Sequence, residues 1–104
     1  MRPDTLLIGC GRLGSAVGLG LADAGHTVAA IRRDAGRVPA PLVAVGADLT
    51  RGAPDLPDLD LGLLVVALTA RPRTEEAYRA TYVDGMLRAL DAVAAAGQRP
   101  ARAV

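Results

Sequence analysis

The sequence predicts an α/β fold, in which a parallel sheet carries helices on its faces. Short apolar runs without polar alternation are separated by segments of helical periodicity, the pattern of buried parallel strands joined by helices. The first run, Thr5–Ile8, leads directly into a glycine turn, Gly9-Cys10-Gly11-Arg12-Leu13-Gly14. Since 51% of the 104 residues are hydrophobic and 22% charged, we expect one folded domain spanning residues 1–104.

The first helix is expected to follow the glycine turn. Its apolar positions recur at spacings of four, four and three, and we expect them to face the sheet: Leu13, Val17, Leu21 and Ala24. Gly25 ends this helix. Val28–Ile31 and Leu42–Val45 read as the second and third strands, joined by a stretch too short for a long helix.

The next strand is Leu61–Leu68, the most apolar of the set, for which we expect a central position. Arg51–Asp60 contains Pro54 and Pro57, so a loop or single turn is expected where a doubly wound fold usually has a helix.

The last helix has the clearest periodicity. Thr74 can cap it, with Glu75 and Glu76 in its first turn. The positions expected to face the core are Val83, Leu87, Leu90, Ala94 and Gly97. Pairs on the opposite side are expected among Asp84, Arg88 and Asp91. Ala101–Val104 then begins a further strand, which makes the sheet Rossmann-like and truncated, with about four strands and the start of a fifth.

Composition excludes several classes of function. With 12 basic and 11 acidic residues and only two aromatic rings, nucleic acid and membrane surfaces are not expected partners. All basic residues are arginine, so lysine chemistry is closed to this chain. Cys10 and His26 are single and cannot build a usual zinc shell, so no metal is expected. A reducing, cytoplasmic setting fits the lone cysteine.

The glycine turn is the strongest functional signal. Gly9 permits a tight turn, Gly11 lets the backbone approach a pyrophosphate, and Gly14 lets the helix pack closely on the strand. The unpaired N–H groups at the helix start would face the phosphates. A strand before the turn, and a helix and a strand after it, are the context that this dinucleotide-binding motif requires.

The end of the second strand predicts which dinucleotide is bound. NAD-binding versions carry an acid there for the ribose hydroxyls, whereas this chain has Arg32 followed by Arg33. A guanidinium can hold a 2′-phosphate through two parallel bonds, which favours NADP. A solvated arginine pair is the alternative, and Asp34 turned inward would allow NAD.

Three further residues have open roles. Asp48 after the third strand is a candidate acceptor for the adenine amine, or a turn-initiating residue. Cys10 reads better as a small buried residue of the turn than as a reactive thiol, and His26 as a surface residue completing the helix end.

Five segments carry a family resemblance: Leu7–Gly14, Ala24–Val28, Ile31–Arg33, Ala47–Thr50 and Thr81–Met86. Together they resemble the N-terminal portion of an atypical extended short-chain dehydrogenase/reductase of the NAD-dependent epimerase/dehydratase group, over nearly the whole chain. The common family turn has one more residue between its first glycines. The resemblance implies that residues of the turn hold the pyrophosphate, Gly9, Gly11, Arg12, Leu13 and Gly14. It implies Arg32 and Arg33 at the ribose phosphate, Asp48 and Leu49 at the adenine, and Ala67 at the ribose side.

The catalytic pair of that family, Tyr-x-x-x-Lys, does not occur in this chain. The fourth residue after Tyr78 is Tyr82, and the fourth after Tyr82 is Met86. We therefore expect no catalytic residue and nucleotide binding only, with the catalytic and substrate region beyond Val104, as in a fragment. A truncated sheet edge would favour self-association. The alternatives are a non-catalytic nucleotide-binding or interaction module, or the cofactor domain of a hydroxyacid- or ketopantoate-type dehydrogenase.

Overall fold

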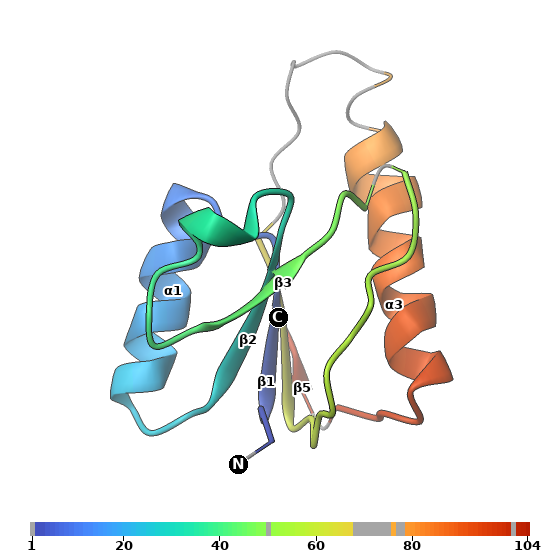
Figure 1. Ribbon diagram of the computed structural model, residues 1–104. Helices are drawn as coiled ribbons and strands as arrows, with labels where there is room; N and C mark the ends of the chain where they lie inside the picture. The colour runs from blue at the N-terminus through green and yellow to red at the C-terminus, as the bar shows by residue number, and fades with distance from the viewer. Residues whose placement is uncertain (1, 50, 68–75, 77–78, 101) are drawn as a thin grey trace.

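The computed structural model describes residues 2–49, 51–67, 76, 79–100 and 102–104, and it confirms the α/β fold (Figure 1). Within these residues one parallel sheet contains the strands β1 (Thr5–Ile8), β2 (Val28–Arg32), β3 (Val43–Gly46), β4 (Leu63–Val66) and β5 (Arg102–Ala103). Their order is β3-β2-β1-β4-β5. The expected strands, including the start of a fifth, are confirmed. The middle position belongs to β1, with β4 beside it.

Parallel pairing brings the strand ends to one side of the sheet. Ile8 is in register with Ile31 on β2 and with Val66 on β4, and Arg32 is in register with Gly46 on β3. The carboxyl ends of these strands form what we call the carboxyl edge, at the top of Figure 1, where the helix α1 (Arg12–Asp23) also begins.

The two faces of the sheet are covered by different helices (Figure 1). The helix α1 lies on one face, and a π-helical turn η2 (Arg79–Gly85) that continues into α3 (Met86–Ala95) lies on the other. Because successive strand side chains point to opposite faces, Leu6 and Ile8 join the α3 side of the core and Leu7 joins the α1 side.

An extended segment covers the same face of the sheet as α3. A short 3-10 turn η1 (Ala35–Arg37) joins β2 to β3, and the chain from β3 to β4 has no helix in its described residues, as expected. Leu59 and Leu61 of this connection are buried in the cluster that contains Ala89. The backbone N–H of Asp60 donates to the carbonyl oxygen of Pro3 at 2.9 Å. The segment thus covers apolar sheet surface where a helix would otherwise lie.

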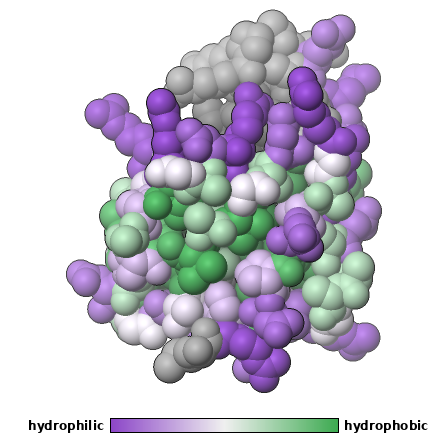
Figure 2. All heavy atoms as spheres, in the orientation of Figure 1, coloured by the Kyte–Doolittle hydropathy of each residue, from purple (hydrophilic) through white to green (hydrophobic). Residues whose placement is uncertain are grey.

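Figure 2 shows apolar side chains gathered across the middle of the face that carries β3, with hydrophilic side chains above and below. On the edge strand β3, Val43 is 39% exposed.

The prediction for the buried face of α1 was wrong at three of its four positions. Leu21 is partly buried and packs on the α1 side of the core, as expected, whereas Ala24 is exposed. Leu13 is 73% exposed and Val17 is 37% exposed, whereas Gly14 and Gly18 are buried. A Cβ on Gly18 would lie 2.9 Å from Leu42 Cδ1 and 3.1 Å from a methyl of Leu7. The helix turns its glycine face to the sheet, because glycine lets the helix backbone come closer than leucine allows.

The core-facing stripe predicted for the last helix was also wrong. Val83 is 51% exposed and Leu87 54%, whereas Ala89 and Val93 are buried. The exposed set is the predicted stripe: Val83, Leu87, Leu90, Ala94 and Gly97. Small residues again form the contact face, about a quarter turn away from the most apolar side.

Other expectations for this helix have mixed outcomes. Thr74 and Glu75 lie outside the described residues, and Glu76 is helical and exposed. Instead of pairing with an aspartate of its own helix, Arg88 donates from Nη1 to the carbonyl oxygen of Leu49 at 2.8 Å. None of the helices in the described part of the chain is both long enough and apolar enough to cross a membrane.

The helix orientation can be tested with Val93→Ala and Leu87→Ala. Val93→Ala should lower the free energy of unfolding by about 2 kcal/mol, since Val93 is 4% exposed and its removal leaves a cavity. Leu87→Ala, the control, should change it by less than about 0.5 kcal/mol although it removes more atoms. Urea denaturation measures both; a larger loss for Leu87→Ala would contradict the orientation.

Candidate functional site

The topological switch point of the sheet lies at the carboxyl edge between β1 and β4. From β1 the chain proceeds to β2 and β3 on one side, and β4 lies on the other, so the order reverses at this point. In open α/β sheets such a switch point is where ligands bind. Gly9 and Ala67, the residues that follow β1 and β4, line it, and the N–H of Ala67 donates to the carbonyl oxygen of Ile8 at 2.8 Å.

Two glycines of the turn are required by the fold itself. Gly9 has a φ of 92°, which a residue with a side chain adopts only with strain. A Cβ on Gly14 would lie 2.6 Å from the carbonyl oxygen of Gly9 and 3.4 Å from the Cβ of Ala67. Gly14 is therefore the contact through which the first turn of α1 packs against the ends of β1 and β4.

The middle glycine has a different environment. Gly11 is the N-cap residue of α1, and its φ of −79° is open to any residue. No atom lies within 4 Å of the position that a Cβ would occupy. Neither backbone strain nor protein packing explains a glycine here.

The start of α1 presents unpaired donors. The backbone N–H groups of Gly11 through Gly14 donate no hydrogen bond within the described residues. The first turn contains no acidic residue, and the Arg12 side chain is exposed. Orphan N–H groups, the helix dipole and a cation together favour an anion at this end of the helix.

The buried cysteine is a packing residue of the turn. Cys10 is 1% exposed and belongs to the α1 side of the core. Its Sγ lies 3.4 Å from the Oγ of Ser15. His26 lies at the opposite edge of the sheet, where its Nδ1 is 3.4 Å from Asp4 Oδ1.

Arg32 reaches the glycine turn. Its Nη1 donates to the carbonyl oxygen of Cys10 at 2.8 Å and to that of Arg37 at 3.3 Å. The side chain is half-buried. This single guanidinium joins the end of β2, the glycine turn and η1.

Arg33 belongs to a separate charge cluster. Its Nε lies 3.5 Å from Asp48 Oδ2, and the same oxygen lies 3.7 Å from the Nε of Arg51. The side chain of Arg33 is 74% exposed and that of Asp48 is 23% exposed. Asp34 does not turn inward: its Oδ1 accepts from the N–H of Gly36 at 3.1 Å, and it caps η1.

Leu49 faces the core, and its carbonyl oxygen is bound by Arg88 of α3. Its side chain is 7% exposed and packs in the α3 side of the core. The structure thus gathers the turn, Ala67, Arg32, Arg33 and Asp48 at the carboxyl edge, while the side chain of Leu49 lies in the core below. Sequence reasoning missed Arg51, although its position three residues after Asp48 is a spacing that permits pairing across a turn.

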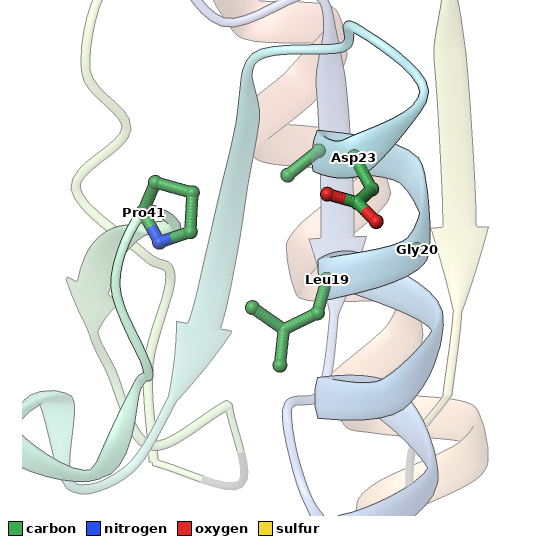
Figure 3. A pocket seen from close by; sticks show the side chains of 5 residues that line it. Leu19, Gly20, Asp23 and Pro41 are labelled. Carbon is green, nitrogen blue, oxygen red and sulfur yellow. The ribbon is translucent and has the colours of Figure 1, made fainter.

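A shallow pocket lies elsewhere, between α1 and the segment that precedes β3 (Figure 3). Its volume is about 310 Å³, and it is lined by Leu19, Gly20, Ala22, Asp23 and Pro41. It adjoins the C-terminal half of α1, at the other end of the helix from the glycine turn. In this lining Asp23 is the one ionisable side chain.

Comparison of the chain with protein-family models, with curated protein sequences and with solved structures finds no match. The site is therefore defined by its own geometry, as a glycine turn with unpaired backbone N–H groups at the switch point of a parallel sheet.

The close packing at Gly14 is tested by Gly14→Ala. It should lower the free energy of unfolding by about 1–3 kcal/mol, since the added Cβ meets backbone. Gly20→Ala in the same helix is the matched control, because its Cβ would have no atom within 4 Å. It should raise stability by about 0.5–1 kcal/mol. Equal effects in urea denaturation would show that α1 does not approach the turn this closely.

Proposed function

We propose that this chain binds a pyridine dinucleotide at the carboxyl edge, with NADP preferred over NAD. The observation that carries the proposal is Gly11. The fold accounts for Gly9 and Gly14, but at Gly11 the backbone conformation is ordinary and the space beside it is open. Gly20 and Gly52 have the same open space, but Gly11 stands at the start of α1 beside the unpaired N–H groups, where a missing Cβ lets a pyrophosphate approach the backbone.

The residues present fit the parts of this cofactor. The unpaired N–H groups between Gly11 and Gly14 would bind the pyrophosphate. Ala67 offers a small side chain at the switch point, where the ribose on the nicotinamide side would pass. Asp48 would lie towards the adenine. When bound, the cofactor supplies hydride transfer, while the chain supplies binding and orientation.

The preference for NADP rests on charge. Arg32 and Arg33 stand at the end of β2, where NAD-binding sites carry an acid. The nearest alternative acid, Asp34, is engaged as the cap of η1. A 2′-phosphate gains charge-assisted hydrogen bonds from a guanidinium that a ribose hydroxyl cannot match.

The chain would then be the cofactor domain of an epimerase/dehydratase- or reductase-type oxidoreductase. This class agrees with the resemblance of the sequence to extended short-chain dehydrogenase/reductases. A nucleotide-binding module without catalysis, and the cofactor domain of a hydroxyacid- or ketopantoate-type dehydrogenase, would use the same site. Turnover in hydride-transfer assays with NADPH and carbonyl or sugar-nucleotide substrates would exclude the module without catalysis. We expect no turnover from the chain alone, since neither tyrosine has a lysine four residues later.

The variant Gly11→Ala tests both whether the chain binds the dinucleotide and whether it does so at the glycine turn. The unmodified chain should bind NADPH about ten- to a hundredfold more tightly than NADH in calorimetric titration. Gly11→Ala should weaken both by about tenfold or more, because the Cβ enters the space that the pyrophosphate needs. The free energy of unfolding should change by less than about 1 kcal/mol. Unchanged affinity in a folded variant would rule out the phosphate site.

A further inference from the structure

We infer that the two consecutive arginines have different tasks: Arg32 positions the phosphate-binding turn, and Arg33 alone reads the 2′-phosphate. This division rests on the proposed function. It begins with strand geometry, since successive residues at the end of β2 point to opposite faces. Arg32 follows the alternation of Ala30 towards the α1 side, and its guanidinium lies at Cys10. Arg33 pairs with Asp48, and the residue after Asp48, Leu49, packs its side chain on the α3 side of the core.

The contact of Arg32 fixes a peptide plane. In a planar trans peptide the C=O and the following N–H point in opposite directions. The bond from Arg32 Nη1 to the Cys10 carbonyl oxygen, 2.8 Å long, therefore sets the direction of the Gly11 N–H, away from the arginine. Ser15 Oγ lies 3.4 Å from the same oxygen and adds a weaker contact. Without these donors the plane between Cys10 and Gly11 rotates easily, because glycine accepts either sign of φ.

The same contact limits what else Arg32 does. Its second bond, to the carbonyl oxygen of Arg37 at 3.3 Å, also uses Nη1. The guanidinium is thereby held between two carbonyl oxygens in a half-buried position. Both N–H groups of Nη1 are used in this way, so only the Nε and Nη2 groups remain as donors. A phosphate that drew the guanidinium towards itself would abandon the two hydrogen bonds of Nη1 and release the turn on which the pyrophosphate depends.

Arg33 is in the opposite situation. Its side chain is 74% exposed, and its ion pair with Asp48 is long, at 3.5 Å. Exposed ion pairs of this kind contribute little to stability. Arg51 lies 3.7 Å from the same carboxylate oxygen and remains its partner when Arg33 moves. Arg33 can therefore exchange the carboxylate for a 2′-phosphate at small cost.

The test uses two matched variants, Arg32→Met and Arg33→Met, which keep an apolar stem and remove the charge. Dissociation constants for NADPH and NADH are measured by calorimetry on the folded proteins. Arg33→Met should weaken NADPH by about ten- to a hundredfold and leave NADH unchanged. Arg32→Met should weaken both by the same factor, about tenfold, so that their ratio is preserved. Arg32→Lys, which retains a donor for the Cys10 carbonyl, should restore part of the affinity for both.

Amide NMR of the chain without nucleotide reports on the conformation of the glycine turn directly. In amide NMR spectra, Arg32→Met should shift the Gly11 resonance and Arg33→Met should not, while resonances of the sheet stay in place in both. A loss of NADPH affinity alone in Arg32→Met, or no change for either nucleotide, would overturn the division, as would an unmoved Gly11 resonance. If the unmodified chain binds neither nucleotide, the proposed function fails, and the Gly11 resonance still reports whether Arg32 holds the turn. Should Arg32→Met not fold, Arg32→Lys takes its place. The ratio of its NADPH and NADH affinities and the position of its Gly11 resonance are then the two criteria.

Discussion

The approach of α1 to the sheet is the constraint on which the rest of the molecule depends. Gly14 lies against the carbonyl oxygen of Gly9, and one turn later Gly18 lies between Leu7 and Leu42. These two contacts bring the helix backbone down onto the strands and fix the helix start directly above the switch point of the sheet. Its unpaired N–H groups are therefore held where β1 and β4 end. The unpaired donors at the carboxyl edge are a consequence of this packing, and they need no specialised side chain.

The opposite face of the sheet is covered by a helix and an extended segment together. The helix α3 contacts the sheet through Ala89 and Val93, and the extended segment that contains Leu59 and Leu61 fills the adjoining surface. Arg88 joins α3 to the loop after β3 through the carbonyl oxygen of Leu49. The position of the loop with Asp48 is thus set from the α3 side, while the glycine turn is set from the α1 side. The two halves of the candidate site are built by separate layers of the fold.

Strands, glycine turn and helix ends could be predicted from the sequence, because each depends on local chemistry. Gly25 and Gly97 end helices with positive φ of 99° and 73°, as expected for left-handed caps. The buried faces of both helices could not be predicted from hydrophobic periodicity. Periodicity identifies the side with the largest apolar residues, such as Leu87, whereas contact is decided by how closely the backbone can approach. In a chain without Phe or Trp, small residues such as Ala89 form that contact.

The arginines show a second limit of sequence reasoning. Arg32 and Arg33 are identical in type and adjacent in sequence, and both were expected at the ribose phosphate. Their surroundings differ because β2 ends between a turn with an available carbonyl oxygen and a loop with a carboxylate. A guanidinium bound to backbone carbonyls in a half-buried place holds the backbone in position, while an exposed one at the end of a long ion pair remains exchangeable. The acceptor that the fold presents to each arginine therefore decides whether its guanidinium is held by backbone or stays exchangeable, and the proposed division of tasks rests on this difference.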